Sequence, residues 1–310
     1  MSSIISLAKT HGVDLPSYQP NVLAGRVHIQ DKTPNLLAFL DKLNIGVSVL
    51  GDADACEQIA FENVEDAKNE GLHYVELRFS PLYMAQAFGL SLHAVVDAVV
   101  SGIKRANRVF NYKANLIGIL SRTYGVDACQ RELEALLSFS SDLVAIDLAG
   151  DEKGFPCCLF TQHFKQVRDA GLKVTIHAGE ADGPGSIWDA INLLGANRIG
   201  HGVCAFQDGA LMDYMLQHQI GIESCILSNY QTGTWTEISQ HPVQIFLEKG
   251  MLVSLNTDDP GVSNNTLLSE YDLARTQIKL SDDAISTLKQ NAVKQSFIDN
   301  DFKQRLMSLE

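Results

Sequence analysis

Short runs of apolar and β-branched residues recur along the chain and alternate with longer segments of helical period. In segment 52–70 apolar residues recur at helical spacing until Gly71 ends the pattern. Segment 281–297 repeats this pattern, and Ser281 stands where a helix N-cap is expected, with acidic residues in the first turn. The apolar runs predict seven strands, at 72–79, 115–120, 143–150, 173–179, 197–202, 220–225 and 251–259.

Strands that alternate with helices predict an α/β fold built on a parallel sheet. Polar residues gather where the apolar strands end, as at His177, His201 and Asp258. In a (β/α)8 TIM-type barrel the chemistry lies at this end of the strands, whereas a doubly wound sheet would show a glycine-rich first turn, which the sequence lacks. We therefore predict a single barrel domain over 1–310, with one strand fewer than a closed barrel requires.

Composition narrows the class of partner. The net charge of −13 argues against a nucleic-acid partner, because such binding depends on clustered Lys and Arg. The first residues do not form a signal peptide, and no apolar run is long enough to cross a membrane. The six cysteines form no CxxC pair, which is typical of reduced thiols. We expect a cytoplasmic protein without membrane or nucleic-acid partners, and the sequence leaves its oligomeric state open.

His177 and Asp258 are the candidate metal ligands. Imidazole and carboxylate together suit Zn²⁺ or a similar divalent ion. A single histidine at a strand end is more often structural. Here HAGE (177–180), GHG (200–202) and NTDDP (256–260) each end a strand, and their combination favours a metal site.

Glu180 and His201 are the candidate catalytic residues. Glu180 follows the strand that carries His177, and general acid or base catalysis would explain a carboxylate in that place; stabilisation by a helix N-terminus is the alternative. His201 stands between two glycines, which would let substrate or water approach closely, so His201 could orient a water molecule. The alternative is a histidine that is buried in the core for structural reasons. Asp258 and Asp259 are adjacent, so one can face a metal while the other faces a substrate; a solvated acidic turn is their alternative reading.

Two other patterns do not predict catalysis. Glu76 and Arg78 lie on one face of their strand, and we expect them to pair inside the barrel. Cys157 and Cys158 follow a proline, but no cysteine stands at position 160. The P-C-x-x-C signature of the small zinc deaminases is therefore absent from the sequence.

The motifs together resemble the adenosine deaminase family of metal-dependent amidohydrolases, and the resemblance extends over nearly the whole chain. It favours the adenosine branch over the adenine and nucleotide branches. The motifs that carry it are HYVELRFSP (73–81), DLAGDE (147–152), HAGE (177–180), GHG (200–202), ESCILSN (223–229) and NTDDPG (256–261).

The resemblance implies a (β/α)8 barrel in which a zinc-bound hydroxide attacks C6 of adenosine, or of 2′-deoxyadenosine, giving the inosine nucleoside and ammonia. It implies that His177 and Asp258 bind a single Zn²⁺. Further residues take part in the implied reaction: Glu180 would protonate ring nitrogen N1, His201 would hold the attacking water and help to deprotonate it, and Gly150 and Asp259 would bind other purine nitrogens.

One feature of the family is missing from this sequence. The family's first strand carries an H-x-H pair that supplies two more zinc ligands. In this sequence residues 1–20 contain a single histidine, His11, in a segment of helical character. Three interpretations follow: an ordinary adenosine deaminase whose start is misassigned or shortened here, a shorter product with weak metal binding and turnover, or a non-catalytic binder of purine nucleosides. A pure binder should lose Glu180 or His201, and both are present.

Overall fold

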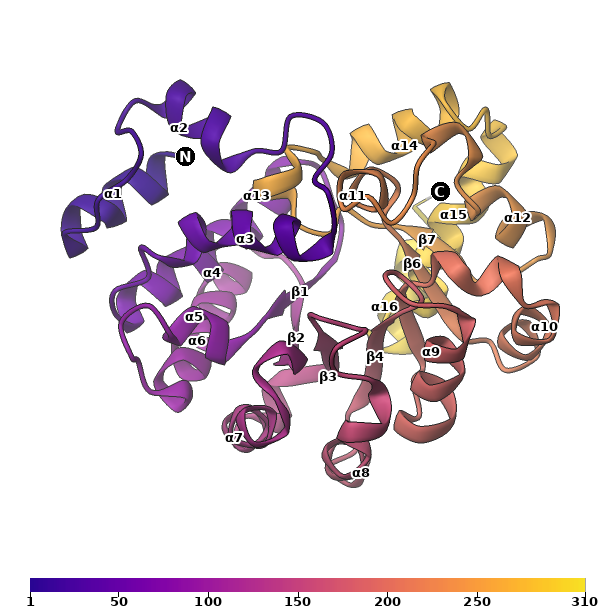
Figure 1. Cartoon of the computed structure of the whole chain (residues 1–310), viewed down its shortest axis with the longest axis horizontal. Coiled ribbons are helices and arrows are strands. Elements are labelled where there is room, and N and C mark those ends of the chain that lie inside the picture. The colour runs from indigo at the N-terminus through magenta and orange to yellow at the C-terminus, as the bar shows by residue number, and fades with distance from the viewer. Residues whose placement is uncertain (310) are drawn as a thin grey trace.

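The computed structural model describes residues 1–309 and contains a seven-stranded sheet in which every neighbouring pair of strands is parallel. The strands lie side by side in chain order, as Figure 1 shows. They are β1 (Val75–Phe79), β2 (Ala114–Ser121), β3 (Leu143–Ala149), β4 (Lys173–Ala178), β5 (Arg198–His201), β6 (Gly221–Ser224) and β7 (Val253–Leu255).

Helices surround the strands, and α1 and α2 lie at the periphery (Figure 1). Four helices precede β1: α1 (Ser2–His11), α2 (Pro20–Val27), α3 (Leu36–Val47) and α4 (Ala53–Asn69). The helices between strands are α5 (Pro81–Ala85), α6 (Leu92–Phe110), α7 (Val126–Leu137), α8 (Thr161–Asp169), α9 (Pro184–Asp189), α10 (Gly209–Gln217), α11 (Ile226–Gln231) and α12 (Val243–Glu248). After β7 come α13 (Pro260–Ser263), α14 (Leu267–Thr276), α15 (Asp282–Gln295) and α16 (Asn300–Met307).

Short helical turns complete the connections between these elements. Five are 3₁₀ helices and one, η4, is a π-helix. They are η1 (Arg122–Tyr124), η2 (Ser140–Asp142), η3 (Cys157–Phe160), η4 (Ala190–Leu194), η5 (Val203–Gln207) and η6 (Ile238–Gln240).

The local signals in the sequence place most elements correctly. Ser281 caps α15 as predicted, with its Oγ accepting a hydrogen bond from the Ala284 amide at 3.2 Å. The predicted helix at 52–70 is α4, which Asp52 caps. The predicted strand at 251–259 is too long, because β7 ends at Leu255. Asp258 adopts a left-handed backbone conformation with φ of 59°, which a strand cannot contain.

Ion pairs across the sheet require it to curve. Arg78 on β1 contacts Glu223 on β6 at 2.5 Å and Asp147 on β3 at 3.0 Å. Arg198 on β5 contacts Glu76 on β1 at 2.7 Å and also pairs with Glu223. Charged side chains therefore fill the concave side of the sheet. Glu76 and Arg78 both lie there, but they do not pair with each other: Glu76 pairs with Arg198, and Arg78 pairs with Asp147 and Glu223.

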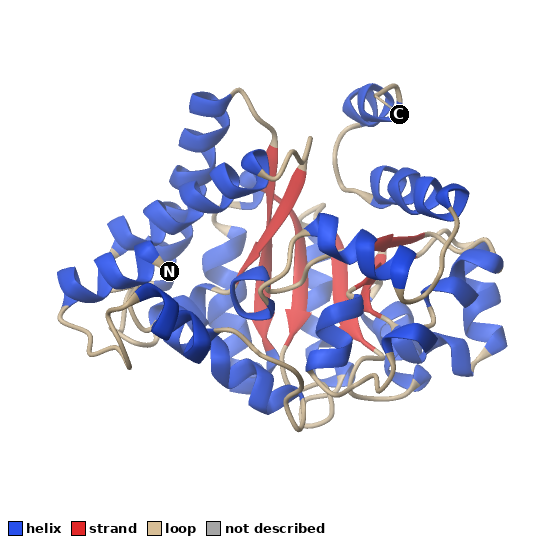
Figure 2. Cartoon of the chain, turned by 90° about the horizontal axis from the view of Figure 1, so that it is seen from above, coloured by secondary structure: helices blue, strands red, loops and turns tan. Residues whose placement is uncertain are grey.

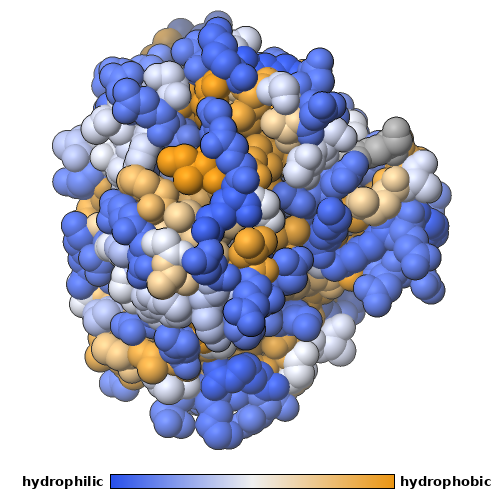
Figure 3. Space-filling model, turned by 90° about the vertical axis from the view of Figure 1, so that its right-hand side faces the viewer, coloured by the Kyte–Doolittle hydropathy of each residue, from blue (hydrophilic) through white to orange (hydrophobic). Residues whose placement is uncertain are grey.

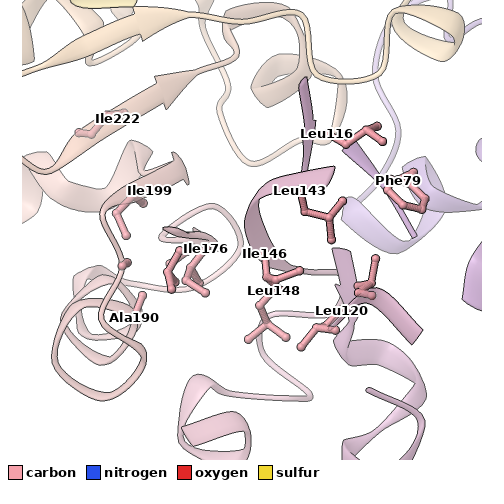
Figure 4. Packing of buried hydrophobic residues seen from close by; sticks show 14 of the residues in the cluster. Phe79, Leu116, Leu120, Leu143, Ile146, Leu148, Ile176, Ala190, Ile199 and Ile222 are labelled. Carbon is pink, nitrogen blue, oxygen red and sulfur yellow. The ribbon is translucent and has the colours of Figure 1, made fainter. Parts of the chain in front are cut away.

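The convex side of the sheet is apolar and packs against the helices. Ile146, Leu148, Ile176 and Ile199 are fully buried in one continuous cluster with residues of the surrounding helices (Figure 4). Burial of each such side chain contributes about 2 kcal/mol to folding. On the outside of the molecule polar side chains cover most of the face in Figure 3, with apolar patches between them.

Within residues 1–309 the sheet remains open, because no backbone pairing joins β7 to β1. The strands and their covering helices form a TIM-like α/β fold with seven strands, as predicted (Figure 2). None of the described helices combines the length and the apolar character that a membrane span needs.

Candidate active site

Three predicted residues converge at the carboxyl ends of the strands. His177 lies near the end of β4, His201 ends β5, and Asp258 follows β7. One ligand atom of each lies within 4.8 Å of the others. His201 and Asp258 both have positive φ, 62° and 59°, so the chain turns sharply where it presents them. This cluster has the donor atoms of a metal site.

Asp147 orients His177. The Nδ1 of His177 lies 3.1 Å and 3.0 Å from the two carboxylate oxygens of Asp147, which is completely buried. Burial alone would raise the pKa of Asp147, but His177 and Arg78 hold it well below the usual range. Burial alone would lower the pKa of His177, but the Asp147 carboxylate raises it. The carboxylate accepts the Nδ1 proton, so the neutral ring presents the lone pair of Nε2 to a metal.

Ser228 fixes the carboxylate of Asp258. Its hydroxyl donates a hydrogen bond to Asp258 Oδ2 at 2.6 Å. Ser228 is itself fully buried in α11. This contact leaves the other carboxylate oxygen of Asp258 available to the cluster.

A chain of hydrogen bonds sets the tautomer of His201. The amide of Val243 donates to His241 Nδ1 at 3.3 Å, so His241 carries its proton on Nε2 and donates it to Asn229 Oδ1, also at 3.3 Å. This orients the Asn229 amide, whose Nδ2 donates to His201 Nδ1 at 3.1 Å. Burial lowers the pKa of His241 to about 3, which keeps it neutral in this chain. The ring proton of neutral His201 therefore lies on Nε2, toward Glu180.

Glu180 points at His201 from the loop after β4. Its Oε2 lies 3.6 Å from His201 Nε2, and its buried Oε1 has no hydrogen-bond partner in the described part of the chain. Burial raises the pKa of Glu180 to about 7, although His201 opposes the shift. A carboxyl group with this pKa can hold and release a proton near neutral pH.

Gly150 and Asp259 follow the carboxyl ends of β3 and β7. Gly150 follows β3 with φ of 115°, and a side chain there would meet Thr123 Oγ1 at 2.4 Å, so only glycine fits. Asp259 follows Asp258, and burial together with the Asp258 carboxylate raises the pKa of Asp259.

The sequence does not predict the partners that hold these residues. Asp147 gave one usable signal, a carboxylate within an otherwise apolar strand, which needs a partner when buried. Ser228 and Asn229 stand in the ESCILSN motif, but their spacing predicts no role. His241 lies in a loop without periodicity, so nothing in the sequence connects it to His201.

A family model described as adenosine deaminase matches residues 2–309. The chain belongs to the adenosine deaminase family. An adenosine deaminase of Pseudoalteromonas translucida is 53% identical over 307 residues, which cover 99% of this chain and 92% of the relative. One from Vibrio cholerae is 52% identical with the same coverage, and one from Aliivibrio fischeri is 50% identical, covering 100% of this chain and 93% of the relative.

Solved structures support the fold. An adenine deaminase from Arthrobacter aurescens superimposes with a TM-score of 0.91 at 24% identity, covering 99% of this chain and 92% of that one. An amidohydrolase from Burkholderia ambifaria, solved with bound Zn, gives a TM-score of 0.86 at 20% identity, covering 99% of this chain and 84% of that one. The family is metal-dependent, and the cluster of His177, His201 and Asp258 has suitable donors.

Proposed function

We propose that this chain catalyses the hydrolytic deamination of adenosine, and of 2′-deoxyadenosine, to the inosine nucleoside and ammonia. The observation that carries the proposal is the convergence of His177, His201, Asp258 and Glu180 at one end of the sheet. Membership of the adenosine deaminase family, with adenosine deaminases as relatives at 50–53% identity, supports the same substrate class.

His177 and Asp258 suit a single Zn²⁺. Neutral His177 offers the lone pair of Nε2, because Asp147 holds the proton on Nδ1, and Asp258 retains one oxygen beyond its contact with Ser228. His201 carries its proton on the nitrogen that faces the cluster, which favours a hydrogen-bonding role over metal ligation. Bound zinc lowers the pKa of a water molecule so that hydroxide is available near neutral pH.

Glu180 carries the proton in the proposed reaction. Its raised pKa keeps a substantial fraction protonated near neutral pH, so it can donate to ring nitrogen N1 and make C6 electrophilic. His201 donates its Nε2 proton as a hydrogen bond to the attacking oxygen and holds it in place. The tautomer therefore supports the holding role predicted for His201, and it favours Glu180 over His201 for moving protons.

Gly150 and Asp259 are proposed to recognise the purine. The backbone N–H of Gly150 is a donor at a position where no side chain would block a ring. The raised pKa of Asp259 favours its protonated form, which can donate a hydrogen bond to an unprotonated ring nitrogen. These two contacts would fix the ring so that C6 and N1 face the catalytic groups.

A non-catalytic nucleoside binder is less consistent with the site. Such a protein needs the contacts of Gly150 and Asp259 but has no use for Glu180. A buried carboxylate oxygen without a partner destabilises the fold, and groups with this environment gather at catalytic sites. Glu180 therefore favours an enzyme.

Replacement of Glu180 by glutamine tests the proposal. Glu180→Gln preserves the shape of the side chain but removes the transferable proton, and we expect kcat for adenosine to fall about 1,000-fold. Conversion to inosine is followed by ultraviolet absorbance, with the thermal unfolding midpoint as a check on the fold. Glu134→Gln, on the exposed face of α7, is the matched control and should keep native activity. A Glu180→Gln chain within about 3-fold of the native rate would refute the proton-carrier role.

A further inference from the structure

We infer that Glu152 is a positioning residue that holds the loop carrying Glu180. Its side chain is buried, with 3% of its surface exposed. The carboxylate accepts hydrogen bonds from the backbone N–H groups of all four residues 179–182, at 2.5, 3.2, 2.7 and 3.1 Å. It also accepts one from the Ser186 hydroxyl at 2.5 Å. Five donors therefore converge on one carboxylate.

Each of these donors requires a hydrogen-bond acceptor. Successive backbone N–H groups that point to one place form a concave anion site, and bonds to a charged acceptor are roughly twice as strong as neutral ones. A buried N–H left without an acceptor destabilises the folded chain. Glu152 supplies the acceptor for all four backbone N–H groups with one carboxylate, so it fixes the backbone conformation of residues 179–182.

Glu180 depends on that backbone for its position. Its Oε1 has no hydrogen-bond partner among residues 1–309, and its Oε2 is 3.6 Å from His201. The side chain is therefore aimed into the site without being anchored by its own carboxylate. Gly179 has a φ of 66°, and a side chain there would come within 2.4 Å of Ile187 Cδ1, so only glycine fits this path of the loop.

Glu152 also connects two strand ends. It lies two residues beyond Gly150, in the loop after β3, and binds the loop after β4. On the proposed function, Gly150 contacts the purine and Glu180 protonates it. A shift at Glu152 would therefore change the distance between the substrate and its proton donor, and a misplacement of about 1 Å can lower the rate 100-fold.

Glu132 provides a matched control. It is a second buried glutamate that accepts backbone hydrogen bonds, from Leu82 at 3.0 Å and Ser121 at 2.7 Å. Leu82 lies in α5, directly after β1, and Ser121 is the last residue of β2. Loss of Glu132 should loosen the ends of β1 and β2 without affecting residues 179–182.

Hydrogen exchange of the backbone amides tests the inference directly. In Glu152→Gln we expect the amides of residues 179–182 to exchange at least about 10-fold faster, because the neutral amide side chain presents a donor where the carboxylate accepted. In Glu132→Gln those four amides should keep native protection. With zinc supplied, Glu152→Gln should lower kcat for adenosine about 10- to 100-fold while KM changes less than about 3-fold.

Glu152→Asp is the second variant. It retains the charge but is one methylene shorter, so both exchange and kcat should lie between those of the native chain and Glu152→Gln, and it tests the inference if Glu152→Gln does not fold. Native protection of residues 179–182 in the variants would overturn the inference, as would an equal loss of kcat in Glu132→Gln. Absence of turnover in the native chain would contradict the proposed function alone, because exchange is measured without substrate.

Discussion

His201 owes the position of its ring proton to two side chains, Asn229 and His241, that do not touch substrate in the proposed mechanism. The sequence predicts that His201 belongs to the site, because a strand delivers it between two glycines. It does not predict the direction of the hydrogen bonds around the ring. That direction depends on the contacts of His241 with Asn229 and of Asn229 with His201, which join residues distant in sequence and form only on folding.

Replacement of Asn229 by leucine tests this dependence. Leucine has a similar volume but can neither accept from His241 nor donate to His201, so the ring proton of His201 is free to occupy either nitrogen. We expect kcat to fall about 10- to 100-fold with the zinc content unchanged. Nitrogen NMR of the imidazole should show one tautomer in the native chain and a mixture in Asn229→Leu. Asn63→Leu, on the exposed face of α4, is the control, and an unchanged tautomer in Asn229→Leu would contradict the prediction.

At the scale of elements, the sequence predicts the strands and main helices well because their signals are local. Ser281 caps α15 and the pattern over 52–70 becomes α4. The loops at the strand ends are not predicted, because buried glutamates distant in sequence hold them. Glu132 on α7 is one of these: it joins the ends of β1 and β2 through Ser80, Leu82 and Ser121.

Glu132 should make the stability of this region depend on pH. Burial raises its pKa from the ordinary 4.5 to about 7, so the folded chain binds the proton more tightly than the unfolded chain. The resulting stabilisation is complete below about pH 4.5 and is lost as the pH rises through about 7. Between pH 5 and pH 8 we expect the native free energy of unfolding to fall by up to about 3 kcal/mol more than that of Glu132→Gln.

Urea unfolding at several pH values measures this difference. Glu134→Gln removes an exposed carboxylate from the same helix and should follow the native pH dependence. If the free energy of unfolding depends on pH in the same way for the native chain and Glu132→Gln, ionisation of Glu132 does not destabilise the folded chain, and the prediction is wrong.

At the scale of the whole molecule, the curved sheet brings separate strand ends to one place. The sequence predicts this from the α/β alternation and the polar strand ends, and the structure confirms the seven parallel strands. It does not predict that Arg78 and Glu76 pair across the sheet with Glu223 and Arg198, because these contacts exist only once the sheet is curved. The single-domain organisation of residues 1–310 remains a prediction.

Conversion of adenosine by the purified chain, followed together with its zinc content, tests the proposed activity most directly. We predict that the chain binds zinc and forms inosine, that a chelator removes both the metal and the activity, and that added Zn²⁺ restores them. A folded chain loaded with zinc that forms no inosine would contradict the proposed function. Turnover that persists after complete removal of the metal would contradict the assignment of His177 and Asp258 as its ligands.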